Sequence, residues 1–149
     1  MQKEDSHKKK TYKFLAGFAA LLFFVLSSSD AHAALLFINS QKSSIEVGDI
    51  VKLRVGVDTQ GININNGEAV VSFPTDLIQA IGVDSASSIF DLWVDQPRFS
   101  NATGEIVFNG GVANPGFIGT GGTVLWITVK AKKAGSATFS LGSAAVRAN

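Results

Sequence analysis

The side chains that could perform acid–base or nucleophilic chemistry are few in this sequence and unevenly placed. Both histidines, His7 and His32, lie within the first 33 residues, and the chain has no cysteine. After residue 33 the catalytic candidates are carboxylates: Asp76, Asp84, Asp91, Asp95 and Glu105. A glycosidase needs two carboxylates facing each other, roughly 5 Å or about 6.5–9.5 Å apart. No catalytic motif accompanies these residues, and Asp is also favoured in turns. We therefore expect no enzymatic activity.

The same residue types restrict metal and phosphate sites. Zinc is held mainly by cysteine and histidine, and neither occurs after residue 33. The calcium loop D-x-[DN]-x-[DN]-G is absent, and Asp91 with Asp95 is a poor substitute for it. The glycine-rich stretch 110–122 lacks the lysine and the following helix of a phosphate-binding loop. We expect no metal and no cofactor.

Carbohydrate recognition is the binding chemistry that remains open, because exposed aromatic rings can stack on sugars. Trp126 falls on the polar side of a predicted strand, and Trp93 falls in a predicted loop. The alternative is structural: Trp126 packs beneath a loop or strand, and Trp93 closes one end of the fold, since tryptophan is usually well buried. Asn101-Ala102-Thr103 matches a glycosylation acceptor, or forms an ordinary turn.

The amino-terminus has the pattern of a secretory signal peptide over residues 1–33. Lysines 8–10 and 13 precede a 13-residue apolar run, Phe14 to Leu26, and the segment ends in Ala31-His32-Ala33. Basic, apolar and A-x-A parts in this order predict export and cleavage near Ala33. An uncleaved anchor is the alternative, but a spanning helix needs about 20 apolar residues. The mature chain is then secreted, periplasmic or at the cell surface, with no membrane span.

Removing this leader changes the charge balance. Five of the 13 basic and three of the 12 acidic residues lie in 1–33, so eight basic residues face nine acidic ones afterwards. A near-neutral surface offers no attraction to nucleic acid or anionic lipid. Residues 34–149 suit one domain.

Alternating polarity in the mature chain predicts strands from end to end. In 51–58, Val51, Leu53, Val55 and Val57 share one face, a repeat of two. The expected strands are 34–39, 51–58, 66–73, 77–83, 105–109, 123–131, 136–141 and 144–147, with a brief one at 99–100. Residues 89–93 are either a helical turn or an irregular crossing. These strands, separated by Gly, Pro, Asn and Asp, predict an all-β jelly-roll sandwich of eight or nine strands.

The order of several segments resembles the cohesin domain. They are ALLF (34–37), VGDIVKLRVGVDT (47–59), GININNGEAVVSFP (61–74), GEIVFNGG (104–111), GTGGTVLWITVKAK (119–132) and AGSATFSL (134–141). The resemblance covers nearly all of residues 34–149, and order and spacing carry it. It implies a nine-stranded jelly roll that binds dockerin modules, which carry the calcium and bring polysaccharide-degrading enzymes to a scaffold protein.

The resemblance also implies a partner-binding face. Outward polar residues on the third strand are prominent contacts in cohesins. The matching positions and their neighbours here are Asn66, Glu68, Val70, Ser72, Val107 and Asn109, with Arg98 and Ser100 on the adjacent strand. Such a face can form an interface of about 800 Å² per side. A carbohydrate-binding module and a structural adhesion sandwich are the alternatives, since one fold hosts several functions.

One departure concerns the carboxyl end. The sequence stops at residues 144–149, where cohesins usually continue through an Asp-Gly-rich turn into a last strand beside the first. This departure has two explanations: the domain is truncated, or its last strand is supplied otherwise. If the last strand is absent, the first strand presents an unpaired edge, a known route to aggregation.

Overall fold

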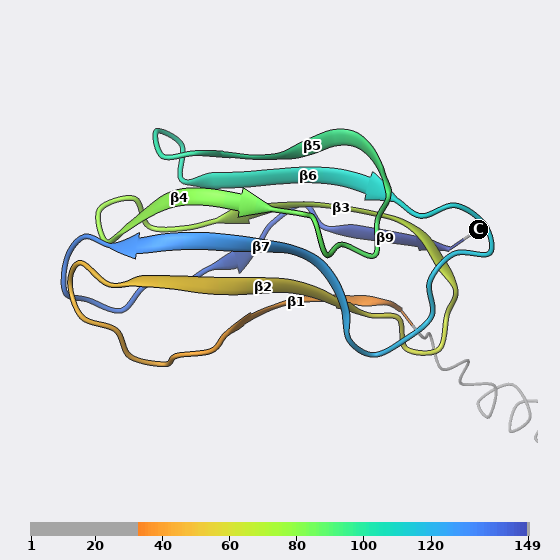
Figure 1. The fold of residues 1–149 in the computed structure, drawn as a ribbon, viewed down its shortest axis with the longest axis horizontal. Coiled ribbons are helices and arrows are strands. Elements are labelled where there is room, and N and C mark those ends of the chain that lie inside the picture. Colours follow the sequence, from red (N-terminus) through yellow and green to blue (C-terminus); the bar gives the residue numbers. More distant parts are fainter. Residues whose placement is uncertain (1–32, 149) are drawn as a thin grey trace, which may run out of the picture. The chain divides into compact units, whose positions relative to one another are not determined.

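Nine β-strands and no helix make up residues 33–148, the part of the chain that this computed structural model describes (Figure 1). The strands are β1 (Leu35–Ser40), β2 (Ile50–Asp58), β3 (Ile64–Ser72), β4 (Ile78–Asp84), β5 (Leu92–Ser100), β6 (Glu105–Gly111), β7 (Gly122–Ala131), β8 (Ser140–Leu141) and β9 (Ala145–Ala148). Within this range, no helix could cross a lipid bilayer. The predicted leader lies outside the described residues, apart from Ala33.

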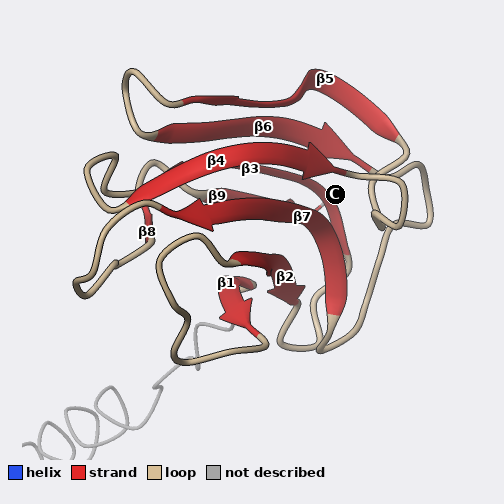
Figure 2. Cartoon of the chain, turned by 60° about the vertical axis from the view of Figure 1, so that its left-hand side comes forward, coloured by secondary structure: helices blue, strands red, loops and turns tan. Residues whose placement is uncertain are grey.

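The strands form two antiparallel sheets that lie face to face (Figure 2). One sheet has the order β1-β2-β7-β4, and the other has the order β5-β6-β3-β8 with β9 also paired to β3. This arrangement confirms the predicted all-β sandwich.

Period-two alternation decides which side chains meet between the sheets. In β2, Val51, Leu53, Val55 and Val57 are buried, while Lys52 on the opposite face is exposed. The facing sheet contributes buried side chains of the same kind: Ile64, Ala69, Val71, Ile106 and Phe108. Each fully buried Val, Leu, Ile or Phe stabilises the fold by about 1.5–3 kcal/mol relative to exposure. The apolar core accounts for a stable domain without disulfides.

Strand β5 is where the sequence-based expectation was wrong. Only residues 99–100 were expected to be extended there, yet β5 runs over nine residues, Leu92–Ser100. Its pairing with β6 is interrupted twice, between Trp93 and Asp95 and between Asp95 and Arg98. As an edge strand it exposes apolar side chains, including Val94, so no regular alternation marks it. Trp93 accordingly lies in a strand and not in a loop.

The last two strands lie along the same edge of β3. The strand expected over 136–141 is only Ser140–Leu141 and pairs with the end of β3, whereas β9 pairs with residues 64–68. In the described residues β1 pairs only with β2, so it is an edge strand. The expected truncation of the domain before a strand beside β1 stays a prediction.

Asn101, the first residue of the possible glycosylation acceptor, fastens the two sheets together. It lies in the turn between β5 and β6, and its side chain reaches the backbone of Ala80 in β4. Its Oδ1 accepts the Ala80 N–H (2.8 Å), and its Nδ2 donates to the Ala80 carbonyl (2.8 Å). The amide thus occupies the edge of β4 as a neighbouring strand would. This geometry favours the structural interpretation of Asn101.

Replacing Asn101 with alanine should lower the free energy of unfolding by about 1–3 kcal/mol, because two partly buried backbone groups of Ala80 lose their partners. Asn39→Ala is the matched control, since Asn39 is exposed and has no side-chain hydrogen bond among the described residues. Urea titration of both variants measures the difference. Equal unfolding midpoints for the two variants would show that the hydrogen bonds of Asn101 do not stabilise the sandwich.

Candidate functional site

The outer face of the five-stranded sheet brings the predicted site residues together. In β3, Gly67, Ala69 and Val71 are buried toward the core, so the residues between them face outward. Those outward residues, Asn66, Glu68, Val70 and Ser72, are half-buried. Val107 and Asn109 in β6 are half-buried as well. The sequence therefore identified one side of one sheet.

Strand register places these residues in cross-strand pairs. Glu68 lies opposite Asn109 and Val70 lies opposite Val107 in the antiparallel ladder of β3 and β6. Ser72 lies opposite Glu105, at the other end of the ladder from Asn66. Directly opposed side chains on one face are close enough to interact. The face consequently has a polar end, an apolar centre and a second polar end.

A hydrogen-bonded network occupies the first polar end. Asn66 Nδ2 donates to Asn109 Oδ1 (3.1 Å) and to the Gly110 carbonyl (3.0 Å). Asn109 Nδ2 in turn donates to Glu68 Oε2 (3.1 Å). Each side chain therefore holds the next in a defined orientation.

Arg147 of β9 completes this network, and sequence reasoning did not include it. Its Nη2 donates to Glu68 Oε1 (2.7 Å), and its Nη1 donates to Asn66 Oδ1 (3.1 Å). The Glu68 carboxylate thus accepts from Arg147 on one oxygen and from Asn109 on the other. An exposed ion pair contributes only about 0–1 kcal/mol to stability. Its main effect here is to fix the position of Glu68.

The neighbouring edge strand extends the face. Arg98 lies opposite Val107 and Asp95 lies opposite Asn109 in the pairing of β5 with β6. Arg98 Nη1 and Asp95 Oδ1 form an ion pair at 3.3 Å, and both side chains are more than half exposed. Val70 and Val107 consequently lie between two charged groups, Arg147–Glu68 and Arg98–Asp95. An apolar centre with a polar rim is the arrangement found in protein–protein interfaces.

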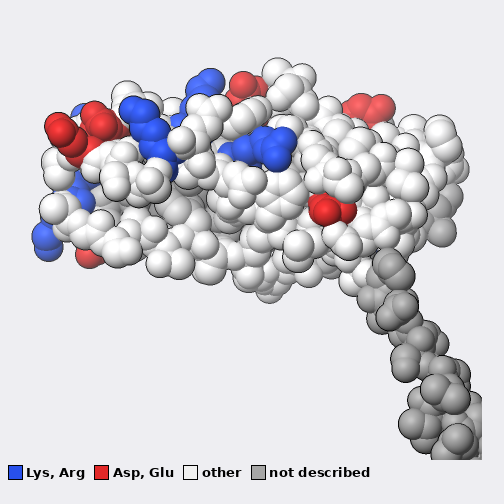
Figure 3. All heavy atoms as spheres, turned by 90° about the horizontal axis from the view of Figure 1, so that it is seen from below, with Lys and Arg blue, Asp and Glu red and all other residues white. Residues whose placement is uncertain are grey.

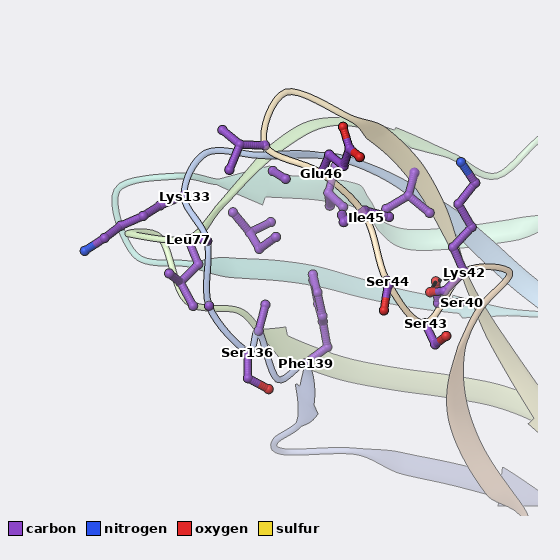
Figure 4. A pocket seen from close by; sticks show the side chains of 18 of the residues that line it. Ser40, Lys42, Ser43, Ser44, Ile45, Glu46, Leu77, Lys133, Ser136 and Phe139 are labelled. Carbon is purple, nitrogen blue, oxygen red and sulfur yellow. Dashed lines mark hydrogen bonds between the residues drawn. The ribbon is translucent and has the colours of Figure 1, made fainter.

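Two hollows lie elsewhere on the domain. One, of about 760 Å³, lies between the segment after β1 and the segment after β7 (Figure 4). Its floor includes core residues such as Leu53 and Val129, and Glu46 is its only acidic lining residue. The second, of about 620 Å³, has Asp84 as its only acid. Neither hollow carries the carboxylate pair that glycoside hydrolysis needs.

The five candidate carboxylates lie on different segments: Asp76 between β3 and β4, Asp84 in β4, Asp91 between β4 and β5, Asp95 in β5 and Glu105 in β6. Asp84 Oδ1 accepts the Ala86 N–H (2.9 Å) in a turn, and Asp95 pairs with Arg98. Across residues 33–148, no three His, Cys, Asp or Glu side chains lie close enough to share a metal ion. On the side seen in Figure 3, basic and acidic side chains are interspersed on a mainly uncharged surface.

The two tryptophans do not form a common stacking surface. Trp93 is half-buried against the core, edge to face with Phe90 at 6.0 Å between ring centroids. It also covers Gly110, where an added Cβ would lie 2.6 Å from the indole. Trp126 lies on the other sheet, and its indole Nε1–H donates to Ser87 Oγ (3.2 Å). Trp93 is thus structural.

Several solved structures with a similar backbone arrangement are cohesins, although the sequence itself matches no protein-family model and no curated protein. The cohesin of a type I cohesin–dockerin complex from Clostridium thermocellum is 17% identical, with a TM-score of 0.62 over 81% of this chain and 86% of that chain. The second type II cohesin module of the ScaA scaffoldin from Acetivibrio cellulolyticus is 14% identical, with a TM-score of 0.60 over 74% of this chain and 77% of that one.

A third similar structure comes from scaffoldin B of Acetivibrio cellulolyticus. Its sixth cohesin, solved in complex with a Cel5 dockerin, is 16% identical, with a TM-score of 0.59 over 74% of this chain and 82% of that one. At such identities the likeness concerns the backbone arrangement. This chain therefore has the fold of the cohesin module.

Proposed function

We propose that this chain is an exported, non-catalytic cohesin-type module that binds a dockerin-bearing protein through the outer face of its five-stranded sheet. The observation that carries the proposal is the network of Asn66, Glu68, Asn109 and Arg147 beside the apolar pair of Val70 and Val107. Similar cohesins have been solved in complex with dockerins, which supports the choice of partner.

Preorganisation makes this face suited to a specific partner. Side chains that are already held by hydrogen bonds lose little conformational freedom on binding, and each rotamer-rich side chain left mobile costs about 0.5–1.5 kcal/mol to immobilise. Glu68 presents a fixed carboxylate to a hydrogen-bond donor on the partner. Val70 and Val107 offer apolar surface that the partner can bury. The calcium of such a complex would belong to the dockerin. The proposed partners are polysaccharide-degrading enzymes that carry a dockerin.

A titration of residues 34–149 against a panel of dockerins and a set of insoluble polysaccharides tests the proposal. We expect binding to at least one dockerin. Binding to glycans alone would reject the dockerin proposal, and binding to neither would leave a structural adhesion sandwich as the function.

Glu68→Ala should weaken dockerin binding by about tenfold or more, because the carboxylate at the polar end of the face is lost. Stability should change by less than about 1 kcal/mol, since Glu68 is partly exposed and its ion pair is solvated. Glu46→Ala is the matched control, because Glu46 is exposed in the segment between β1 and β2, outside this face. Calorimetric titration gives the affinity. An unchanged affinity for Glu68→Ala would remove Glu68 from the binding site.

A further inference from the structure

Trp126 lines a hollow of mixed polar and apolar character on the outer face of the four-stranded sheet, a face that the dockerin proposal does not use. Its neighbours along β7, Leu125 and Ile127, are completely buried, whereas Trp126 alternates to the outer side and stays partly exposed. The hollow has a volume of about 620 Å³ and is lined by Trp126 together with Gln41, Lys52, Asp84 and Ser87, among others.

The indole ring is held in place from one side. Its Nε1–H donates to Ser87 Oγ (3.2 Å), which fixes the ring against the loop after β4. Arg54 lies opposite Trp126 on β2, but its guanidinium stacks over the Phe37 ring, 5.3 Å from the ring centroid. Trp126 is therefore an oriented aromatic surface next to a hollow.

Polar groups of both signs surround this ring. Asp84 lies opposite Trp126 on β4, and its Oδ1 accepts the Ala86 N–H, so that Oδ2 has no partner among the described residues. Lys52 of β2 and Gln41 are exposed, and neither side chain makes a hydrogen bond within residues 33–148. The hollow thus offers two ammonium donors, Lys42 and Lys52, one carboxylate acceptor and an amide that can both donate and accept.

We propose that this hollow binds a pyranose unit of a polysaccharide chain. A pyranose ring has an apolar face of C–H groups, which stacks on an indole, and an edge of hydroxyls that both donate and accept hydrogen bonds. Trp126 matches the first property, and Lys52, Asp84 and Gln41 match the second. Mixed charge in the hollow disfavours a purely anionic or purely cationic ligand. Few placed polar groups around an aromatic surface are typical of sites for small ligands.

The position of this site allows both partners to be bound at once. Trp126 is on the outer face of the β1-β2-β7-β4 sheet, and Glu68 is on the outer face of the other sheet. The proposed sugar site is consequently separate from the dockerin face, and its failure would not affect that proposal.

Retention of residues 34–149 on insoluble polysaccharides tests the inference. The panel contains neutral polymers, namely cellulose, xylan and chitin, and an acidic one, polygalacturonate. We expect retention on at least one of them, and the panel separates neutral from acidic sugars. Trp126→Ala should lower the binding constant by about tenfold or more through loss of the aromatic surface. Trp126→Phe keeps an aromatic ring, so its binding constant should fall by a smaller factor than that of Trp126→Ala.

Controls separate binding from folding. Trp126→Phe leaves Trp93 as the only tryptophan, so a sugar-dependent change in fluorescence should disappear in this variant. Glu68→Ala should keep full retention. Lys52→Ala, at an exposed position, should reduce retention a few-fold and serves if Trp126→Ala does not fold. Absence of retention for the unmodified domain, or equal retention for it and for folded Trp126→Ala or Lys52→Ala, would overturn the proposal.

Discussion

Val107→Asp should reduce dockerin affinity by roughly 100-fold, or about 2.7 kcal/mol, while the domain stays folded. Val107 is half-buried at the centre of the face, opposite Val70 on one side and Arg98 on the other. A partner that covers this point has no donor prepared for the new carboxylate and would have to desolvate it, which costs several kilocalories per mole. Calorimetric titration against the dockerin that binds the unmodified domain best measures the effect.

Val47→Asp provides the matched control for this variant. Val47 is 60% exposed in the segment between β1 and β2, and it receives the same change of side chain. We expect its dockerin affinity to equal that of the unmodified domain. Urea unfolding of both variants verifies that Val107→Asp does not act through stability, because a strand substitution of this kind changes stability by up to about 1 kcal/mol. Equal affinities for the two variants would place the dockerin site elsewhere.

The strands that the sequence predicted best are those with one solvent-exposed face and one buried face. In β2 and β7, apolar residues alternate with polar ones over most of their length, and the structure buries the apolar set. The same regularity in β3 and β6 put Asn66, Glu68 and Asn109 on one face, which the register confirms. Local polarity is enough to assign residues to the two faces of a strand, because side-chain direction depends only on position along the strand.

Pairing between distant segments could not be predicted in the same way. Arg147 is 79 residues from Glu68, and only the placement of β9 beside β3 brings them to 2.7 Å. Residues 144–147 were expected to be extended, but nothing local says which strand they pair with. A strand with Arg at an outward position near the end of the chain was the available signal.

Edge strands weaken the sequence signal for a different reason. Within residues 33–148, one side of β5 has no neighbouring strand, so two irregularities and exposed Leu92 and Val94 are tolerated. The alternation that defines a strand is lost there, and Trp93 was consequently assigned to a loop. The inward direction of Trp93 follows from Gly110, which leaves room for the indole, a long-range relation that spacing does not contain.

Gly104→Ala should lower the free energy of unfolding by about 3 kcal/mol or more, because it combines a left-handed backbone with a steric clash. Gly104 adopts φ +71°, which costs an alanine about 1–2 kcal/mol. An added Cβ would in addition lie 2.5 Å from the Phe73 carbonyl oxygen. The backbone cannot move away freely, because the Phe73 N–H donates to the Gly104 carbonyl (2.8 Å).

Two other glycines separate these contributions. Gly61→Ala has the backbone cost alone, since its φ is +82° and no atom lies within 4 Å of the added Cβ. Gly121→Ala has neither cost, so its stability should stay within about 0.5 kcal/mol. Urea titration should rank the variants Gly104, then Gly61, then Gly121, from most to least destabilised. Equal losses at Gly104 and Gly61 would mean that the strands relax around the methyl group. The β5–β6 turn would then hold β6, which carries Val107 and Asn109, less firmly than a preformed binding face requires.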